Sequence, residues 1–310
     1  MVFKVNNNDS RSIFKKLMAS TADCSWVRRF GRQAGRAVKN ASADYIQSYQ
    51  RTNVKMTELY EETHLASIIP QALEDGRFHL NFQPIVPATG ILKSDMRYEL
   101  LLRMADEQGH MLAPAAFLPI AERYHLCMLL DRWVLRKVLQ WTTCYPEHFA
   151  RLQLCAINLS GHSLSNDRFL DFVIEQFTRN SLAPSKICFE ITEAAAVANI
   201  GKATRLIKWL KQLGCYFALD DFGKGWPSFA ALKLLPVDFL KIDGSLIHNI
   251  VDDYRNLEIV KSINDVGHAM GKKTIAKFVE NEAILQKLRV LGVDYVQGYY
   301  LGRPQPMTFV

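Results

Sequence analysis

The chain has 310 residues, of which 49% are hydrophobic and 22% are charged, a composition that excludes a wholly disordered protein. Its length accommodates a barrel of roughly 250 residues together with an extension. No apolar run approaches the roughly 20 residues that cross a bilayer, and the first residues lack the apolar core of a secretion signal. We therefore expect a cytoplasmic protein without a membrane segment.

The net charge of +7 is concentrated at the start of the chain. Residues 1–56 contain 11 Lys and Arg against 3 Asp and Glu, a balance of +8, which leaves −1 for the remaining 254 residues. Such a segment could contact nucleic acid or anionic lipid, but no motif that reads a nucleic-acid groove accompanies it. We interpret residues 1–56 as a basic N-terminal extension or linker and expect no nucleic-acid partner.

An amphipathic pattern follows this extension. Its apolar residues recur at spacings of three and four: Leu59, Leu65, Ile68, Ile69 and Leu73. This periodicity predicts a linker helix over residues 57–75, leading into a main domain over residues 76–306.

Within the main domain, eight short β-rich runs alternate with helical patterns. The runs cover residues 79–86, 94–104, 152–160, 186–192, 215–221, 239–243, 273–279 and 294–300. The clearest helical patterns cover residues 131–141, 167–178, 202–213, 253–270 and 282–291. This alternation predicts an α/β fold, a (β/α)8 TIM-like barrel preceded by the helical N-terminal extension. The first two runs have no helix between them, so we expect an antiparallel first strand.

Polar residues interrupt the ends of these runs: Glu99, Asn158, Glu190, Asp220, Asp221, Lys241 and Gln297. Taken singly, each has an ordinary structural explanation as a helix cap or a turn residue. In a barrel, however, the strand ends converge on one face, where active sites are built. Four carboxylates and one amide oxygen, without thiolate or imidazole, predict Mg²⁺ or Mn²⁺. Two such ions about 4 Å apart can clamp a phosphodiester and generate a hydroxide.

The motifs that carry these residues occur in one order along residues 66–306. They are Phe82-Gln83-Pro84-Ile85, Tyr98-Glu99-Leu100-Leu101-Leu102-Arg103, Ile157-Asn158-Leu159-Ser160, Glu190-Ile191-Thr192-Glu193, Asp220-Asp221-Phe222-Gly223, Lys241-Ile242-Asp243 and Gln297-Gly298-Tyr299-Tyr300. In this respect the sequence resembles the EAL family of cyclic di-GMP phosphodiesterases.

The resemblance implies a role for each of these residues. It implies metal ligation by Glu99, Asn158, Glu190, Asp220 and Asp221, and contact with the dinucleotide by Gln83, Leu101 and Arg103. It also implies that Lys241, Glu280 and Gln297 complete the catalytic surroundings, together with position 277.

Position 277 departs from the family pattern. The family has Ala-Glu-Gly-Val-Glu where this chain has Ala276-Lys277-Phe278-Val279-Glu280. Lys277 thus stands in place of an acid that serves the second metal, which should be lost or weakened. Its amine could point to solvent or pair with Asp221. Phe278 replaces a glycine, and its ring could crowd the pocket or a neighbouring loop.

Three functions follow from this sequence. The leading one is an EAL-domain protein that binds cyclic di-GMP with weak or no hydrolysis, through an incomplete two-metal site. The first alternative is an active Mg²⁺- or Mn²⁺-dependent phosphodiesterase that produces pGpG. The second is a protein-interaction module without nucleotide binding. A homodimer or a regulatory protein partner is compatible with each function.

Overall fold

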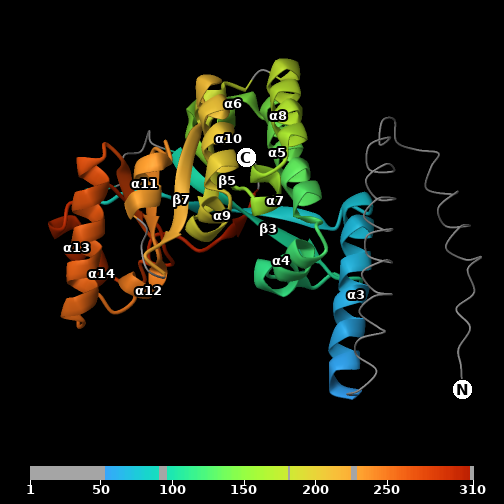
Figure 1. Cartoon of the computed structure of the whole chain (residues 1–310), viewed down its shortest axis with the longest axis horizontal. Helices are drawn as coiled ribbons and strands as arrows, with labels where there is room; N and C mark the ends of the chain where they lie inside the picture. Colours follow the sequence, from blue (N-terminus) through green and yellow to red (C-terminus); the bar gives the residue numbers. More distant parts are fainter. Residues whose placement is uncertain (1–52, 91–95, 181, 225–228, 308–310) are drawn as a thin grey trace, which may run out of the picture.

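The computed structural model describes residues 53–90, 96–180, 182–224 and 229–307 (Figure 1). The predicted basic extension over residues 1–56 therefore lies outside the described residues, apart from its last four. Those four begin helix α3, Asn53–Glu74, where the sequence predicted a helix over residues 57–75. Among the described residues, no helix combines the length and the hydropathy that crossing a bilayer requires.

The strands form one curved sheet whose order follows the chain. Strand β1 (Phe78–Pro84) pairs antiparallel with β3 (Met96–Ala105). From β3 onward the neighbours are parallel: β5 (Leu152–Asn158), β6 (Ile187–Thr192), β7 (Tyr216–Phe222), β8 (Phe239–Ile242), β9 (Lys273–Ala276) and β10 (Tyr295–Val296). All eight predicted runs contain a strand, and the expected antiparallel first strand is confirmed.

The sheet returns to its own start. Strand β2 (Val86–Pro87) follows β1 after a single residue, Ile85, and pairs antiparallel with β10. One continuous stretch of chain therefore borders both β3 and β10, as the predicted TIM-like barrel requires. Two short strands, β4 (Met111–Leu112) and β11 (Gln305–Pro306), extend β3 and β1.

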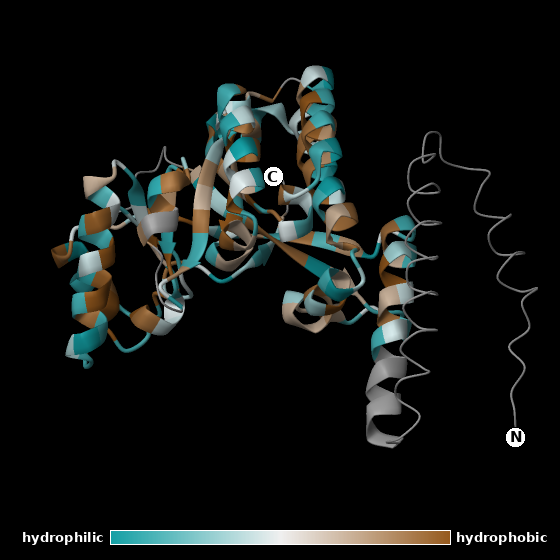
Figure 2. Cartoon of the chain, in the orientation of Figure 1, coloured by the Kyte–Doolittle hydropathy of each residue, from teal (hydrophilic) through white to brown (hydrophobic). Residues whose placement is uncertain are grey.

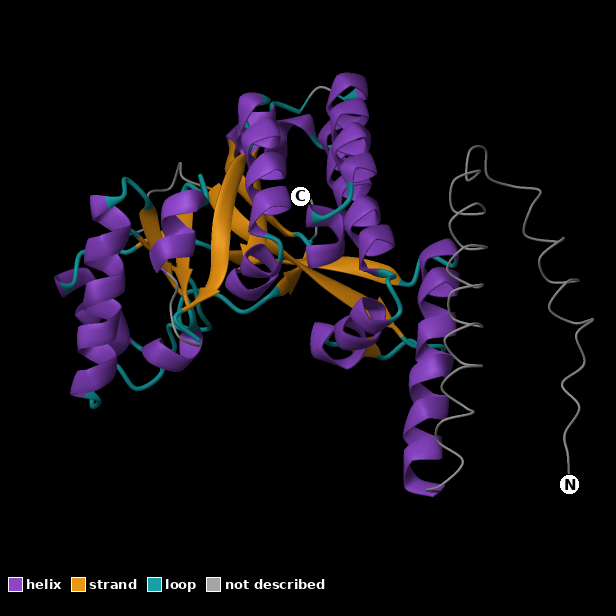
Figure 3. Cartoon of the chain, viewed as in Figure 1, coloured by secondary structure: helices purple, strands orange, loops and turns teal. Residues whose placement is uncertain are grey.

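Helices surround the strands (Figure 3). They are α4 (Pro114–Arg123), α5 (Cys127–Cys144), α6 (Pro146–Arg151), α7 (Gly161–Leu164), α8 (Asp167–Arg179), α9 (Glu193–Ala198), α10 (Ile200–Gln212), α11 (Phe229–Leu234), α12 (Gly244–Ile247), α13 (Tyr254–Ala269) and α14 (Glu282–Val290). Side-chain caps fix three of the predicted helix starts: Asn166, Asp253 and Asn281 each accept a hydrogen bond from a backbone N–H of the first turn.

Two layers of apolar side chains hold the fold together. The long helices carry both hydrophobic and hydrophilic residues (Figure 2), and their apolar sides pack on the outside of the sheet. A smaller cluster fills the barrel interior: Ile85, Leu154, Ala156, Cys188, Ala218, Phe239, Ile275 and Tyr295. These residues come from successive strands, so the interior is a packed core, and only the ends of the barrel can host a site.

Candidate active site

The polar residues predicted at the strand ends come together in the structure. Asn158, the last residue of β5, lies directly beside Glu190 of β6 in the sheet register. Asn158 Nδ2 donates a hydrogen bond of 2.7 Å to Glu99 Oε1 on β3. The order β3-β5-β6 thus assembles three side chains that lie far apart in the sequence.

Lys241 on β8 is the charged centre of this cluster. Its side chain is fully buried, and Nζ donates hydrogen bonds to Glu99 Oε2 at 2.9 Å and to Glu190 Oε2 at 2.5 Å. Gln297 Nε2 also donates to Glu99 Oε2, at 2.9 Å. Burial alone would raise the pKa of Glu99, but the adjacent Lys241 charge and the hydrogen bonds outweigh it and lower the pKa to about 2. Glu99 is therefore an ionised carboxylate with both oxygens hydrogen-bonded.

Glu190 is the incompletely satisfied member of the cluster. Its Oε1 atom is buried and has no hydrogen-bond partner within the described part of the chain. Burial, and next the negative charge of Glu99, raise the pKa of Glu190 to about 8. A buried acceptor without a partner is costly, and this oxygen is suited to a cation or a proton.

Lys277 forms a second charged centre beside the first. Its Nζ donates hydrogen bonds to Asp220 Oδ1 at 2.8 Å and to Asp221 Oδ1 at 2.6 Å. The amine therefore does not point to solvent: only 15% of the side chain is exposed. Burial would lower the pKa of Lys277, but the charge of Asp220 and the two hydrogen bonds raise it. The ammonium group thus remains charged between the two acids.

The backbone of Asp221 explains how two consecutive acids can face one ammonium group. Asp221 has a φ of 55°, in the left-handed region that Asp tolerates better than most residues. The register of β7 against β8 shifts between Leu219 and Phe222 at this point. The irregularity breaks the alternation of a regular strand, in which neighbouring side chains point to opposite faces.

Phe278 has an unfavourable backbone conformation and an exposed ring. Its φ is 59°, which costs a residue with a side chain about 1–2 kcal/mol relative to glycine. The ring is 57% exposed, and it lies so close to Gly244 that a Cβ atom there would meet ring atoms at 2.1 Å and 2.5 Å. A glycine would adopt this φ without strain, and the ring of Phe278 packs on the start of α12.

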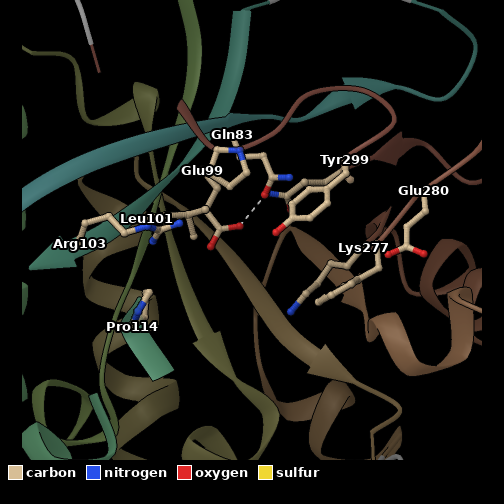
Figure 4. Close-up of a pocket in the computed structure, with 12 residues that line it drawn as sticks. Gln83, Glu99, Leu101, Arg103, Pro114, Lys277, Glu280 and Tyr299 are labelled. Atoms are coloured by element: carbon tan, nitrogen blue, oxygen red, sulfur yellow. Dashed lines mark hydrogen bonds between the residues drawn. The ribbon is translucent and has the colours of Figure 1, made fainter. Parts of the chain in front are cut away.

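A cavity of about 320 Å³ opens beside these two centres. Figure 4 shows Glu99, Leu101 and Arg103 on one side, Lys277 and Glu280 on the other, and Tyr299 between them. Gln83 and Gln297 also line the cavity, and Gln297 Nε2 donates to Gln83 Oε1 at 3.3 Å. The residues expected to contact a dinucleotide thus share one cavity with Lys277.

Other residues of this cavity were not assigned from the sequence. Tyr299, Pro114 and Pro304 line it, and His248 Nδ1 lies 3.1 Å from Glu280 Oε2. Tyr299 follows Gln297 and Gly298 in one of the motifs named above. Its place in that motif could have predicted that it lines the cavity. Pro114 begins α4 and His248 follows α12, and no local sequence pattern distinguished them.

The charges of the two centres limit the number of cations they can hold. Glu99, Glu190, Asp220 and Asp221 carry four negative charges when ionised, while Lys241 and Lys277 carry two positive charges, which leaves −2. No three acidic, histidine or cysteine side chains of the described residues form a ready metal-binding group. The free Oε1 of Glu190 and the net charge fit one divalent cation, whereas a second cation would have to displace Lys277.

Comparisons with known proteins identify the family of this chain. The family model described as "EAL domain" matches residues 66–304. The cyclic di-GMP phosphodiesterase PdeB of Shewanella oneidensis is 37% identical over 272 residues, which are 88% of this chain and 32% of the relative.

Solved structures with a similar fold include two EAL-type structures in complex with c-di-GMP. The structure described as the PaMucR phosphodiesterase in complex with c-di-GMP has a TM-score of 0.73 and 32% identity, and the match covers 78% of this chain and 98% of that one. The FimX EAL domain from Pseudomonas aeruginosa bound to c-di-GMP has a TM-score of 0.72 and 34% identity, with 78% and 96% covered. The chain spans about a third of the length of the first curated relatives it matches, 32% and 33%.

Proposed function

This chain belongs to the EAL domain family, and we propose that it serves cyclic di-GMP signalling by binding this dinucleotide with weak or no hydrolysis. The observation that carries the proposal is the position of Lys277 Nζ, 2.8 Å from Asp220 Oδ1 and 2.6 Å from Asp221 Oδ1. The cavity beside it supports binding, and the ammonium group opposes a second metal.

Binding rests on Gln83, Leu101 and Arg103, which line one cavity. The Arg103 guanidinium can donate charge-assisted hydrogen bonds to a phosphate without any metal. Two similar structures, those of PaMucR and FimX, are described as c-di-GMP complexes. We therefore assign the dinucleotide phosphate to Arg103 and expect Gln83 and Leu101 to contact the same ligand.

One Mg²⁺ or Mn²⁺ ion is part of this proposal. Glu99, Asn158, Glu190 and Asp220 would hold it, because the free oxygen of Glu190 and the net charge of the cluster fit a single dication. Such an ion would supply a Lewis acid next to a phosphate oxygen. Lys241 donates a hydrogen bond to Glu99 Oε2 and keeps this carboxylate ionised and oriented.

Hydrolysis is opposed by the charge at position 277. Replacing an acid by lysine changes the local charge by two units, and a screened pair at 4 Å is worth about 1–4 kcal/mol. A second dication would lie beside an ammonium group that already occupies an oxygen of each aspartate. Activation of water by two metal ions is therefore disfavoured. The phosphate contact proposed for Arg103 does not depend on the second ion.

The test is to measure binding and turnover on one preparation. Calorimetry with cyclic di-GMP in Ca²⁺ reports binding, and chromatography of pGpG in Mg²⁺ and Mn²⁺ reports cleavage. We expect saturable binding with cleavage absent or very slow. Rapid Mn²⁺-dependent cleavage would instead support an active phosphodiesterase, which the name of the PdeB relative favours. No heat at high micromolar ligand would support the protein-interaction module.

A further inference from the structure

A second cavity lies at the opposite end of the barrel from the candidate active site. Its volume is about 480 Å³, compared with about 320 Å³ for the cavity that contains Lys277. Five of the residues that line it are the first residues of their strands: Leu152 of β5, Tyr216 of β7, Phe239 of β8, Lys273 of β9 and Tyr295 of β10. We call this space the amino-end cavity. Its size falls within the range of cavities that hold small molecules.

The packed interior of the barrel separates the amino-end cavity from the candidate active site. Strand β5 begins at this cavity with Leu152 and ends at the site with Asn158, and a strand of this length covers roughly 20 Å. Ala156, Cys188 and Ala218 are among the buried side chains that fill the barrel interior. A ligand in one cavity therefore does not contact the residues of the other.

Three aromatic rings that line the amino-end cavity contact one another in series. The ring centroids of Tyr216 and Phe239 lie 6.0 Å apart, and those of Phe239 and Tyr295 lie 6.1 Å apart, both in edge-to-face arrangements. Phe239 and Tyr295 are buried, whereas 38% of Tyr216 is exposed. The series thus ends in one accessible ring, held by its neighbour, on which a flat molecule can stack.

Positive charge collects around the ring at the other end of this series. Arg97 Cζ lies 5.0 Å and Lys273 Nζ lies 5.6 Å from the centroid of Tyr295, so one ring attracts both cations. The side chain of Lys273 is exposed, and it makes no ion pair within the described part of the chain. Its ammonium group is therefore available to a ligand.

The other charged residues of the amino-end cavity do not neutralise these two cations. Lys186 Nζ donates to Leu152 O at 2.8 Å and to two further backbone oxygens, which fixes a third cation at the cavity wall. Asp238, the one acid among the described residues that line the cavity, contacts Lys211 Nζ at 2.5 Å and accepts from Phe217 N at 2.9 Å. The lining residues thus carry a net charge of +2, although residues 57–310 together carry −1.

Structural roles explain part of this arrangement but not its charge. The cation–π and edge-to-face contacts also stabilise the amino ends of the strands. Neither contact needs three cations around one concave space, where like charges repel one another. An anion bound between them would remove this repulsion.

We propose that the amino-end cavity binds a small anion that carries a flat ring, the chemistry of a mononucleotide. Lys273 and Arg97 donate charge-assisted hydrogen bonds to its phosphate, and its ring stacks on Tyr216. This binding needs neither cyclic di-GMP nor a divalent metal, so it is independent of the proposed function.

Calorimetry with 5′-AMP in EDTA tests the proposal on the whole chain. AMP carries both the ring and the phosphate, and EDTA removes the divalent ions that the candidate active site would bind. We expect saturable binding with a Kd below about 1 mM. Adenosine and inorganic phosphate each keep one of the two groups, and they should bind at least about tenfold more weakly than AMP.

Variants of the amino-end cavity separate the charge from the ring. Lys273→Gln removes the charge of an exposed side chain, and we expect the Kd for AMP to rise about tenfold. Tyr216→Ala removes the stacking ring and should have a similar effect, whereas Tyr216→Phe should bind within about threefold of the parent. Lys261→Gln is the matched control, because Lys261 is an exposed residue of α13 outside the cavity, and it should leave the Kd unchanged. Thermal unfolding checks that each variant is folded.

Several outcomes would overturn this inference. They are no saturable binding of AMP by the parent, equal binding by the parent and Lys273→Gln, and binding of AMP no tighter than that of adenosine or phosphate. AMP binding that is lost in Arg103→Ala and kept in Lys273→Gln would place the ligand in the dinucleotide cavity, which also overturns the inference. The proposed function is tested separately, with cyclic di-GMP, and stands or falls on that measurement.

Discussion

At the scale of single residues, Lys277 places a positive charge between two consecutive acids, Asp220 and Asp221. Its ammonium group satisfies one oxygen of Asp220 and one of Asp221 at hydrogen-bond distance. Two acids close together repel each other unless a cation lies between them. The lysine thus stabilises the folded cluster, and under the proposed function the same contact opposes a second metal.

Lys277→Glu combined with Phe278→Gly should raise hydrolysis of cyclic di-GMP at least 100-fold, an order-of-magnitude expectation for restoring a metal-activated nucleophile. The glutamate restores an acid beside Asp221, and the glycine relieves the positive φ. Initial rates of pGpG formation in Mn²⁺ check this expectation. Lys273→Glu is the control, because it makes the same charge change at the other end of β9. A double variant no faster than the parent contradicts our account.

Arg103→Ala should weaken binding of cyclic di-GMP by roughly 10- to 100-fold, the usual range for losing a hydrogen bond to a charged group. Arg103 extends from β3 into the cavity (Figure 4), where the phosphate is proposed to lie. Calorimetry in Ca²⁺ measures the loss without turnover. Arg151→Ala, which removes an exposed arginine at the end of α6, is the control. Equal affinity of Arg103→Ala and the parent would place the ligand elsewhere.

The raised pKa of Glu190 predicts how stability depends on pH without metal. The native pKa of about 8 lies above the value of 4.5 for an unburied glutamate, so the native state holds an extra proton between them. The stabilisation is fully present below about pH 4.5 and is lost as pH rises through about 8. Urea unfolding in EDTA should show a decrease of a few kcal/mol between pH 5 and 9. Glu190→Gln should flatten this dependence, and an unchanged slope would assign it to another group.

At the scale of elements, the sequence located most helices and strands because their periodicity is strong. The pattern over residues 167–178 became Asp167–Arg179, and the pattern over residues 282–291 became Glu282–Val290. Two features were beyond local patterns. The left-handed backbone conformation of Asp221 depends on the register of β7 against β8. The hydrogen bonds of Lys277 to both aspartates depend on the packing of β7 against the segment after β9.

The contact between the segments after β9 and β10 is a point where a small change should have a large effect. A Cβ atom on Gly298 would meet Val279 N and O at 2.2 Å, and these are backbone atoms that cannot rotate away. Gly298→Ala should therefore destabilise the protein by about 1–3 kcal/mol and weaken ligand binding. Thermal and urea unfolding measure the first effect, and calorimetry measures the second.

Gly201→Ala is the matched control for this change. Gly201 lies near the start of α10, and no atom would lie within 4 Å of an added Cβ. Alanine has a higher helix propensity than glycine, so this variant should be as stable as the parent or slightly more stable. Equal unfolding curves for the two variants would show that the segments after β9 and β10 adapt to the added methyl group.

At the scale of the whole molecule, closure of the barrel brings its first and last strands into contact at the candidate site. Gln83 on β1 and Gln297 after β10 lie near opposite ends of the sheet order, and they meet through a hydrogen bond of 3.3 Å. Glu99 receives hydrogen bonds from Asn158, Lys241 and Gln297, which come from three other strands or strand ends. The hydrogen bonds from Gln297 to Gln83 and Glu99 form only when β1 and β2 join β3 to β10, so we expect loss of closure to weaken the proposed binding together with stability.

Removal of residues 1–52 is the corresponding test of how much of the chain the site needs. The buried residues of α3, which include Ala66, Ile69 and Ala72, pack into the main core, and all lie beyond the deletion. We therefore expect the melting temperature to change by less than about 2 °C, the shift that a loss of about 1 kcal/mol would produce in a domain of this size. The Kd for cyclic di-GMP should stay the same. The deletion removes ten Lys and Arg and three Asp and Glu, so the net charge falls from +7 to 0 and retention on a cation exchanger at pH 7 should be lost. A large drop in melting temperature, or a changed Kd at matched ionic strength, would mean that the basic extension contributes to the fold or to the ligand site.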